Sequence, residues 1–221
     1  MTAESMPDEL REELADGARR FVDPRSIPVR FSNLRAIGQS PLHYRHACQY
    51  REEKSALCRT LGTGTHALTF GTPGVVVFKA RRAGKVWDEY KKQNEAAVIL
   101  SAKEYAASKA MADALHTDPH AAPLLFGSDV RHEVHVVWKF QGRDCAGRID
   151  ALGSTTVIDL KSARSAQPAR FANAGRWAGY HAQIAWYMDG CAAAGLGPRV
   201  PYLIAVESGA PNPVVAMRLT E

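Results

Sequence analysis

The stretch of sequence that decides the fold is Gly147-Arg-Ile-Asp-Ala-Leu-Gly-Ser-Thr-Thr-Val-Ile-Asp-Leu-Lys161. β-branched residues flank Gly153-Ser154, and this arrangement predicts two short strands joined by a two-residue hairpin turn. Successive side chains of a strand point to opposite faces of its sheet. The predicted strands therefore place Asp150, Asp159 and Lys161 on one face and apolar side chains on the other.

The predicted turn also sets the register of the two strands. Leu152 would pair with Thr155, and Asp150 would pair with Val157. Asp150 would then lie diagonal to Asp159, close enough for both carboxylates to reach one ion.

Two carboxylates at this distance repel each other unless a positive charge lies between them. A divalent cation would remove the repulsion, and carboxylate oxygens suit Mg²⁺ or Mn²⁺. Lys161 would then stabilise negative charge on a phosphate or help to deprotonate a water at the cation. The alternative is a surface hairpin with an ordinary Asp–Lys pair, because the D-x-K spacing alone is common.

The chain has 221 residues, of which 46% are hydrophobic and 23% are charged, as in ordinary globular proteins. We predict a single domain over residues 25–221, preceded by an acidic, flexible segment over residues 1–24. No apolar run approaches the roughly 18 residues of a membrane span, and the N-terminus is too polar for a signal peptide. The four cysteines lack C-x-x-C spacing, which disfavours zinc or a disulfide scaffold and indicates a reducing, cytoplasmic location.

The net charge of +5 is unevenly distributed along the chain. Residues 1–24 hold seven acidic residues and three arginines, so the remainder carries +9. This excess is consistent with a polyanion as the partner, although many basic proteins bind none.

A helix that begins near residue 32 is a candidate phosphate-binding site. Ser32 is a suitable N-cap for a helix that runs through Ile37. The first turn of a helix has free N–H groups, and Arg25 and Arg30 lie nearby in the sequence, so a phosphate would be held there. A capped helix with solvated arginines is an equally good interpretation.

Two polar residues distant in sequence are candidate metal ligands. His66 follows Gly62 and Gly64 near the predicted start of a helix, and it is either structural or a ligand that suits Mn²⁺ better than Mg²⁺. Glu133 lies on a strand predicted over residues 132–140, where it either supplies a third acid or faces solvent.

A predicted helix over residues 173–194 carries Tyr180, Gln183 and Tyr187 on one face. The three form either a polar stripe that needs partners or a pair of core tyrosines beside a glutamine. Hydrophobic periodicity further predicts a mostly helical region over residues 88–116 and strands over residues 75–78, 201–206 and 214–219.

Taken in order, His66, Asp150, Asp159-Leu-Lys161 and Gln183-x-x-x-Tyr187 resemble the PD-(D/E)XK nuclease superfamily. The resemblance is closest to the phage-type recombination exonucleases of the RecE (exodeoxyribonuclease VIII) group and more distant to RecB-like nuclease domains. It covers roughly residues 27–206, including four further segments: Phe31-Ser-Asn-Leu34, Ser40-Pro-Leu-His-Tyr-Arg45, Gly62-x-x-x-His66 and Gly179–Tyr187.

The resemblance implies an α/β fold with a mixed central sheet flanked by helices, a restriction-endonuclease-like core. It implies that Asp150, Asp159, His66 and the Leu160 carbonyl bind the metal, with Glu133 as an additional acid found in some members.

The resemblance also implies roles outside the metal site. Lys161 would orient or activate the attacking water, while Gln183 and Tyr187 would position the scissile strand or support Lys161. Arg25 and Ser32 have the spacing of an arginine–serine pair that holds a 5′ phosphate in lambda-type relatives. Arg30 and Arg45 are further candidate phosphate contacts.

The activity implied is that of a Mg²⁺- or Mn²⁺-dependent exodeoxyribonuclease that degrades one strand of linear double-stranded DNA from a 5′ end, in recombination or repair. The implied partners are DNA ends, copies of the chain in a homotrimeric or homotetrameric ring, and a single-strand annealing protein. No iron–sulfur cluster is expected, because no group of cysteines follows the core. The alternatives are a restriction-type or CRISPR-associated endonuclease, a single-strand nuclease of the same fold, or a DNA-end-binding module whose metal site has decayed.

Overall fold

The computed structural model describes residues 27–49, 56–72 and 74–220. They fall into two compact units, each with its own internal contacts. The smaller unit includes residues 27–49 and Lys139–Cys145, and the larger unit includes the described residues from 56 to 138 and from 146 onward. The segment predicted over residues 1–24 lies outside the described residues, and the single domain over 25–221 stays a prediction.

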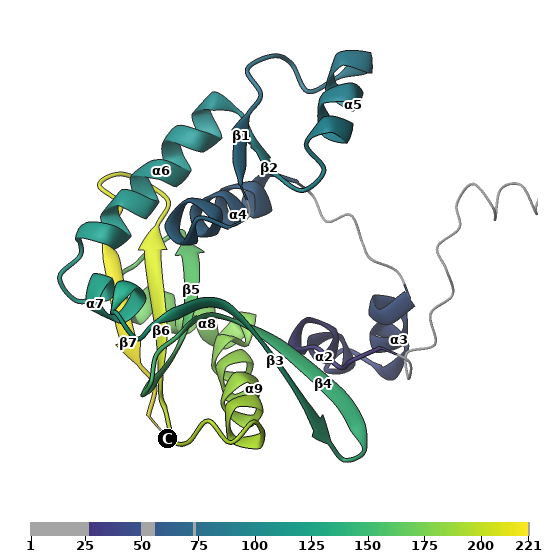
Figure 1. The fold of residues 1–221 in the computed structure, drawn as a ribbon, viewed down its shortest axis with the longest axis vertical. Helices are drawn as coiled ribbons and strands as arrows, with labels where there is room; N and C mark the ends of the chain where they lie inside the picture. The colour runs from purple at the N-terminus through teal and green to yellow at the C-terminus, as the bar shows by residue number, and fades with distance from the viewer. Residues whose placement is uncertain (1–26, 50–55, 73, 221) are drawn as a thin grey trace, which may run out of the picture. The chain divides into compact units, whose positions relative to one another are not determined.

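A five-stranded mixed sheet has the strand order β3-β4-β5-β6-β7 (Figure 1). Strand β5 is antiparallel to β4 and parallel to β6, and β6 is antiparallel to β7. The strands are β3 (Arg131–Phe140), β4 (Arg143–Leu152), β5 (Thr156–Ala163), β6 (Val200–Glu207) and β7 (Val214–Arg218). The predicted mixed α/β fold with its central sheet is confirmed, and three predicted strands correspond to β3, β6 and β7.

The hairpin between β4 and β5 differs in register from the prediction. Leu152 pairs with Val157 and not with Thr155. The Gly153 N–H donates to the Thr156 carbonyl at 3.1 Å, so the two-residue turn consists of Ser154 and Thr155 and not of Gly153 and Ser154. Because the register moves by two residues, every side chain keeps its predicted face of the sheet.

One face of the sheet is covered by α4 (Ala56–Phe70), α6 (Ala102–Thr117) and α7 (Ala121–Phe126). Ile158, Leu160 and Ile204 point to this face and are fully buried against Met111, Leu115 and other apolar side chains. Burying one such side chain stabilises the fold by about 1.5–3 kcal/mol. This face therefore anchors β5, so the alternate residues of β5 are held on the other face.

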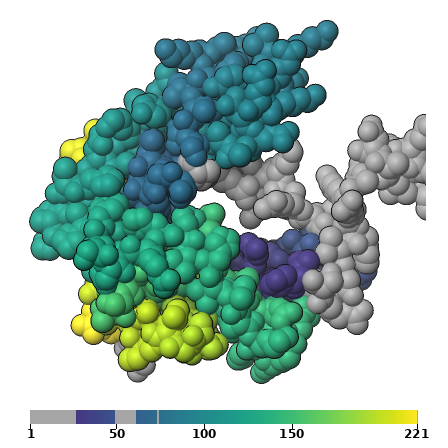
Figure 2. All heavy atoms as spheres, viewed as in Figure 1, coloured from purple at the N-terminus to yellow at the C-terminus, as the bar shows by residue number. Residues whose placement is uncertain are grey.

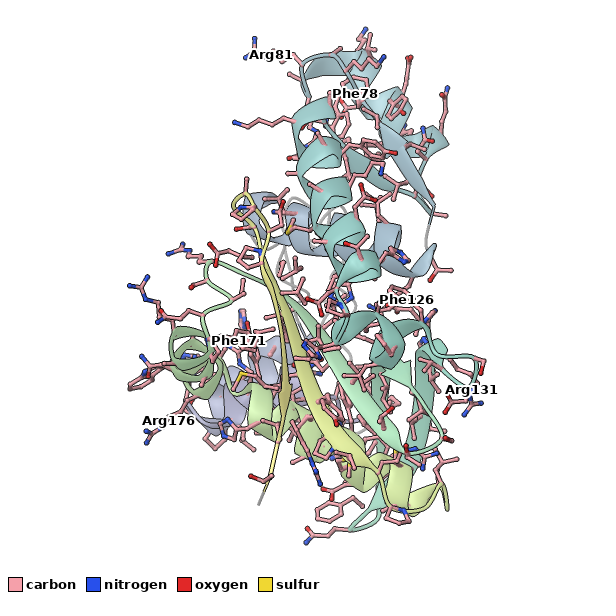
Figure 3. The ribbon with its side chains drawn as sticks, turned by 90° about the vertical axis from the view of Figure 1, so that its left-hand side faces the viewer. Phe78, Arg81, Phe126, Arg131, Phe171 and Arg176 are labelled. Atoms are coloured by element: carbon pink, nitrogen blue, oxygen red, sulfur yellow. The ribbon has the colours of Figure 1, made fainter. Side chains whose placement is uncertain are left out.

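On the second face, α9 (Tyr180–Ala193) contacts β5 and β6, and α8 (Pro168–Ala178) packs on α9. Figure 3 shows Phe126 of α7 and Phe171 of α8 on opposite sides of the sheet. A single helix was predicted over residues 173–194, and this prediction is wrong because the region contains two helices. Gly179 adopts a left-handed conformation (φ 74°) that ends α8 and turns the chain into α9.

Helix α9 packs closely on the sheet through Gly190. A Cβ atom added at Gly190 would lie 2.8 Å from Cζ3 of Trp138, a buried residue of β3. Gly190→Ala is therefore expected to lower the free energy of unfolding by about 1–3 kcal/mol through overpacking, despite the better helix propensity of alanine. Chemical denaturation measures the change. A smaller cost of Gly190→Ala in a Trp138→Phe background would confirm the clash, and an equal cost would contradict it.

A lobe of the larger unit is formed by β1 (Val75–Val77), α5 (Gly84–Gln93) and β2 (Val98–Leu100) (Figure 2). β1 and β2 are parallel and form a separate two-stranded sheet. The continuous helical region predicted over residues 88–116 is wrong, because β2 interrupts it. Ser101 then begins α6 with a capping box in which Ser101 and Glu104 bond each other's backbone N–H groups.

The smaller unit holds α2 (Phe31–Ile37) and α3 (Pro41–Gln49). Its chain enters α2 through Val29, whose N–H donates to the Asp144 carbonyl at 2.7 Å. Among the described residues, no helix is long and apolar enough to cross a membrane.

Candidate active site

Asp150 of β4 and Asp159 of β5 are buried, with 7% and 1% of their surfaces exposed. The Leu160 N–H donates to Oδ2 of Asp150 at 2.8 Å, so one carboxylate is fixed by the backbone that carries the other. Burial raises the pKa of Asp150 and of Asp159 to about 6, although the nearby charge of Lys161 opposes the shift. The carboxyl groups of both residues therefore titrate about one pH unit below neutrality.

Lys161 lies on the same face of β5 as Asp159. Its Nζ is 2.5 Å from Oδ2 of Asp159 and 5.0 Å from the centre of the Tyr180 ring. Burial acts to lower the pKa of Lys161, but the charges of Asp159 and Asp150 outweigh it and the pKa is raised. The ammonium therefore stays charged, held between a carboxylate and an aromatic face.

The Asp159 carboxylate is only partly satisfied. Oδ1 of Asp159 has no hydrogen-bond donor among the described residues, and Oδ2 has only the ion pair with Lys161. Burying a carboxylate oxygen without a hydrogen-bond donor costs free energy. The Asp159 carboxylate can therefore still bind a cation or accept a hydrogen bond from water.

His66, Glu133 and Asp150 form a group of potential metal ligands. One ligand atom from each lies within 4.8 Å of the others. His66 comes from α4, Glu133 from β3 and Asp150 from β4, so the group joins three separate elements. Asp159 is not a member of this group, and its carboxylate is turned to Lys161.

The hydrogen bond of His66 determines which of its ring nitrogens can bind a metal. Nε2 lies 2.9 Å from the Leu160 carbonyl, which can only accept, so Nε2 carries the proton. Nδ1 is then unprotonated, and it lies 3.8 Å from Oδ1 of Asp150. Burial, together with the charge of Lys161, lowers the pKa of His66, so the imidazole is neutral at pH 7.

These residues fit a divalent cation. Nδ1 of His66 lies 3.8 Å from Oδ1 of Asp150, and a carboxylate oxygen of Glu133 lies within 4.8 Å of a ligand atom of each. One imidazole and two carboxylates are hard to borderline donors that suit Mn²⁺ or Mg²⁺. Arg148 supports Glu133 with an ion pair of 2.8 Å between Nε and Oε2.

Gln183 and Tyr187 of α9 border the same site. Nε2 of Gln183 donates to the Tyr187 hydroxyl oxygen at 2.7 Å. Burial and the charge of Asp159 raise the pKa of Tyr187 to about 12, so the hydroxyl keeps its proton at neutral pH. That proton is available for donation, because the Gln183 contact uses the oxygen as acceptor.

The structure thus brings together eight of the candidate site residues in the larger unit: His66, Glu133, Asp150, Asp159, Leu160, Lys161, Gln183 and Tyr187. The position predicted for His66 near the start of a helix is wrong, because α4 begins ten residues earlier, at Ala56. The metal roles implied for Asp159 and the Leu160 carbonyl stay predictions, since here Asp159 pairs with Lys161 and the carbonyl accepts from His66.

The candidate phosphate contacts lie elsewhere in the chain. Arg30, Ser32 and Arg45 are exposed residues of the smaller unit, and Arg25 is outside the described residues. Ser32 was predicted to be the N-cap of α2, and this prediction is wrong. Arg30 takes that position, and no side chain caps the helix.

Sequence reasoning missed two residues of the site. Arg148 pairs with Glu133 across β3 and β4, and Gly147 lets the Tyr187 ring approach β4 closely. A Cβ atom at Gly147 would lie 3.0 Å from Cδ1 of Tyr187. Gly147, directly before Arg148, was a signal in the sequence for a close approach to the strand. The pairing of Arg148 with Glu133 depends on the register between β3 and β4, which the sequence does not show.

The buried acids predict how the metal-free protein responds to pH. Folding raises the carboxyl pKa of Asp150 and Asp159 from 3.8 to about 6, so between these values the folded state binds more protons than the unfolded state. The free energy of unfolding should therefore fall as pH rises from about 4 to 6 and stay low above it. Thermal unfolding in EDTA across this range measures the effect, and Asp159→Asn should reduce it. Stability that rose with pH in this window would contradict the prediction.

Comparison with known proteins places this site in a known family. The profile of the PDDEXK-like domain of unknown function (DUF3799) matches residues 31–221. The fold matches the crystal structure of a putative exonuclease from Eubacterium rectale with a TM-score of 0.65 and 13% sequence identity, over 100% of this chain and 78% of that one. Identity this low shows a shared fold alone. None of the curated proteins compared with the chain matches it. With the family profile covering all of the sheet and every residue of the site, the chain belongs to the PDDEXK-like family DUF3799.

Proposed function

We propose that this protein is a metal-dependent deoxyribonuclease that hydrolyses phosphodiesters at the ends of linear double-stranded DNA, starting from the 5′ end. The observation that carries the proposal is one constellation: the Asp159–Lys161 pair lies beside the metal-ligand group of His66, Glu133 and Asp150. Membership of a PDDEXK-like family supports the nuclease chemistry. The name of the structural neighbour, a putative exonuclease, supports hydrolysis from strand ends.

The chain's own residues would divide the work of hydrolysis. Nδ1 of His66 and the carboxylates of Asp150 and Glu133 would hold a divalent cation. When bound, such a cation supplies Lewis-acid chemistry by lowering the pKa of water and neutralising charge on phosphate oxygens. The Lys161 ammonium would stabilise the negative charge that develops on the scissile phosphate, and Asp159 keeps it charged and oriented.

Gln183 and Tyr187 would position the scissile strand. The Tyr187 hydroxyl is protonated and has a donor, Gln183, on its oxygen. It can therefore donate its own proton to a phosphate oxygen and fix the orientation of the strand beside Lys161. Mn²⁺ should support the reaction at least as well as Mg²⁺, because an imidazole ligand suits Mn²⁺ better.

The test is digestion of linear duplex DNA beside a closed circle of the same sequence, with Mg²⁺ or Mn²⁺ and with EDTA. One linear substrate carries a 5′ label and another carries a 3′ label. The proposal expects metal-dependent loss of the linear DNA only, with short products released early from the 5′ label. Cleavage of the circle would instead indicate an endonuclease, and early release from the 3′ label would reverse the polarity. Absence of cleavage with either metal, with DNA still bound in a gel-shift assay, would leave a DNA-binding protein without nuclease activity.

The assembly expected from the resemblance is part of the same proposal. A trimeric or tetrameric ring would enclose duplex DNA and make digestion processive. Light scattering of the purified protein tests it, since a monomer in solution would remove this basis for processivity.

A further inference from the structure

Helix α8 presents an exposed face that the proposed nuclease chemistry does not use. Trp177 is 84% exposed, which is the largest exposure among the large hydrophobic side chains of the described residues. Arg170 lies seven residues earlier and Asn173 four residues earlier, so the three share one side of the helix, and all are exposed. Phe171 and Gly175 form the opposite, buried side. Trp177 is therefore left in solvent by a helix that already buries its own apolar face.

All the charged residues in the sequence of α8 and its flanking segments are positive. The sequence from Ser162 to Met188 contains Arg164, Arg170 and Arg176 and no acidic residue. The three arginines are exposed, and none forms an ion pair with a carboxylate of the described residues. Figure 3 shows Arg176 directed away from the sheet, on the outer side of α8. Unpaired arginines around an exposed indole complement a ligand that has both negative charge and flat apolar faces.

The C-terminal end of α8 connects this exposed face to the candidate active site. Tyr180, whose ring is 5.0 Å from Nζ of Lys161, follows Trp177 by three residues, a distance the chain spans in at most about 11 Å. Tyr180 also packs against Phe171 of α8, with ring centres 6.1 Å apart. The end of α8 is thus tied to the site through Tyr180.

We propose that the exposed face of α8, with Trp177 at its centre and Arg170 and Arg176 around it, binds single-stranded DNA beside the nuclease site. An unpaired base would stack on the Trp177 indole, and the arginines would contact the flanking phosphates. Single-stranded DNA fits better than duplex, because bases inside a duplex are already stacked on their neighbours and offer no free face. The inference rests on the proposed function in that the strand bound there would be continuous with the strand at Lys161.

The test measures binding without cleavage. Fluorescence anisotropy in EDTA follows a labelled oligo-dT of about 12 nucleotides, comparable to the site sizes of known single-strand-binding domains. The variants are Trp177→Ala, Trp177→Phe and the double variant Arg170→Ala/Arg176→Ala. Val86→Ala and Arg131→Ala are matched controls, because both residues are exposed in the larger unit and lie outside α8.

Trp177→Ala is expected to weaken binding about fivefold to a hundredfold, the value of one base–aromatic stack, and Trp177→Phe should recover most of the loss. The double arginine variant should lower the salt dependence of log Kd by about 0.7 per lost phosphate contact. Both controls should bind as the wild type does.

Three results would overturn the inference: unchanged binding by Trp177→Ala, equal weakening in Val86→Ala, or a change of oligomeric state in Trp177→Ala with binding intact. The last would identify the face as a contact between copies of the chain. Failure of the proposed function can be distinguished from failure of this inference. If only the proposed function is wrong, no cleavage occurs in Mn²⁺, but binding in EDTA still depends on Trp177.

Discussion

Asp150→Asn is expected to reduce metal-dependent DNA cleavage by about a thousandfold or more, the largest loss of activity we predict for a single substitution. Asp150 belongs to the group of potential metal ligands and is also bonded to the backbone of β5, which carries Asp159 and Lys161. Its Oδ1 faces Nδ1 of His66 at 3.8 Å, and its Oδ2 accepts from the Leu160 N–H at 2.8 Å. An asparagine keeps an oxygen for Leu160 but loses the negative charge that a cation requires. The fold should therefore persist while metal affinity falls.

Two measurements separate these effects. Isothermal titration with Mn²⁺ should show weakened binding, and thermal unfolding in EDTA should show a protein at least as stable as the wild type, because a buried charge has been removed. Asp144→Asn is the matched control on the same strand, since Asp144 is exposed and forms an ion pair with Lys139 outside the candidate site. Unimpaired cleavage by Asp150→Asn would exclude the site described here.

Lys161→Met is expected to lower the free energy of unfolding by about 3–5 kcal/mol at pH 7.5 in EDTA, because it leaves the buried carboxylate of Asp159 without a positive partner. It should also abolish cleavage, since the charge that stabilises the phosphate is lost. Combining it with Asp159→Asn should restore most of the stability but none of the activity, because the unpaired charge is removed while the site stays incomplete.

Denaturant unfolding of the four proteins of this cycle measures the coupling between Lys161 and Asp159. Lys139→Met is the matched control, because Lys139 forms an exposed ion pair with Asp144 at 2.8 Å and its loss should change stability little. A Lys161→Met protein as stable as the wild type would show that Asp159 is not charged in the folded state. Activity in that variant would remove Lys161 from the proposed mechanism.

The local parts of the site could be predicted from the sequence. Alternation along a strand places Asp159 and Lys161 on one face, and a shift of register by two residues did not disturb this. Helical spacing likewise predicted that Gln183 and Tyr187 are neighbours, as their 2.7 Å hydrogen bond confirms. The family resemblance extended these local features to a fold, because the order of the motifs along the chain is also a property of the sequence.

Other features of the sequence marked the ends of elements, but the prediction gave more weight to neighbouring patterns. Gly179 lies where a left-handed residue ends α8, yet the apolar run on both sides favoured one long helix. Val98–Leu100 is too short to stand out as a strand, and its partner β1 lies more than twenty residues earlier. The hairpin turn lies one residue later than predicted, and Asp129 accepts hydrogen bonds from both the N–H and the hydroxyl of its residue Ser154.

The sequence by itself determined the chemistry of the hairpin, namely two acids and a lysine on one face of adjacent strands, because the two-residue repeat of a strand requires no other element. Only the tertiary structure decided what completes it. His66 reaches Leu160 across 94 residues of sequence, and Glu133 reaches Arg148 through the pairing of β3 and β4. These contacts depend on how α4 and β3 pack on the sheet, which is set by the shape of the whole core and by no local spacing.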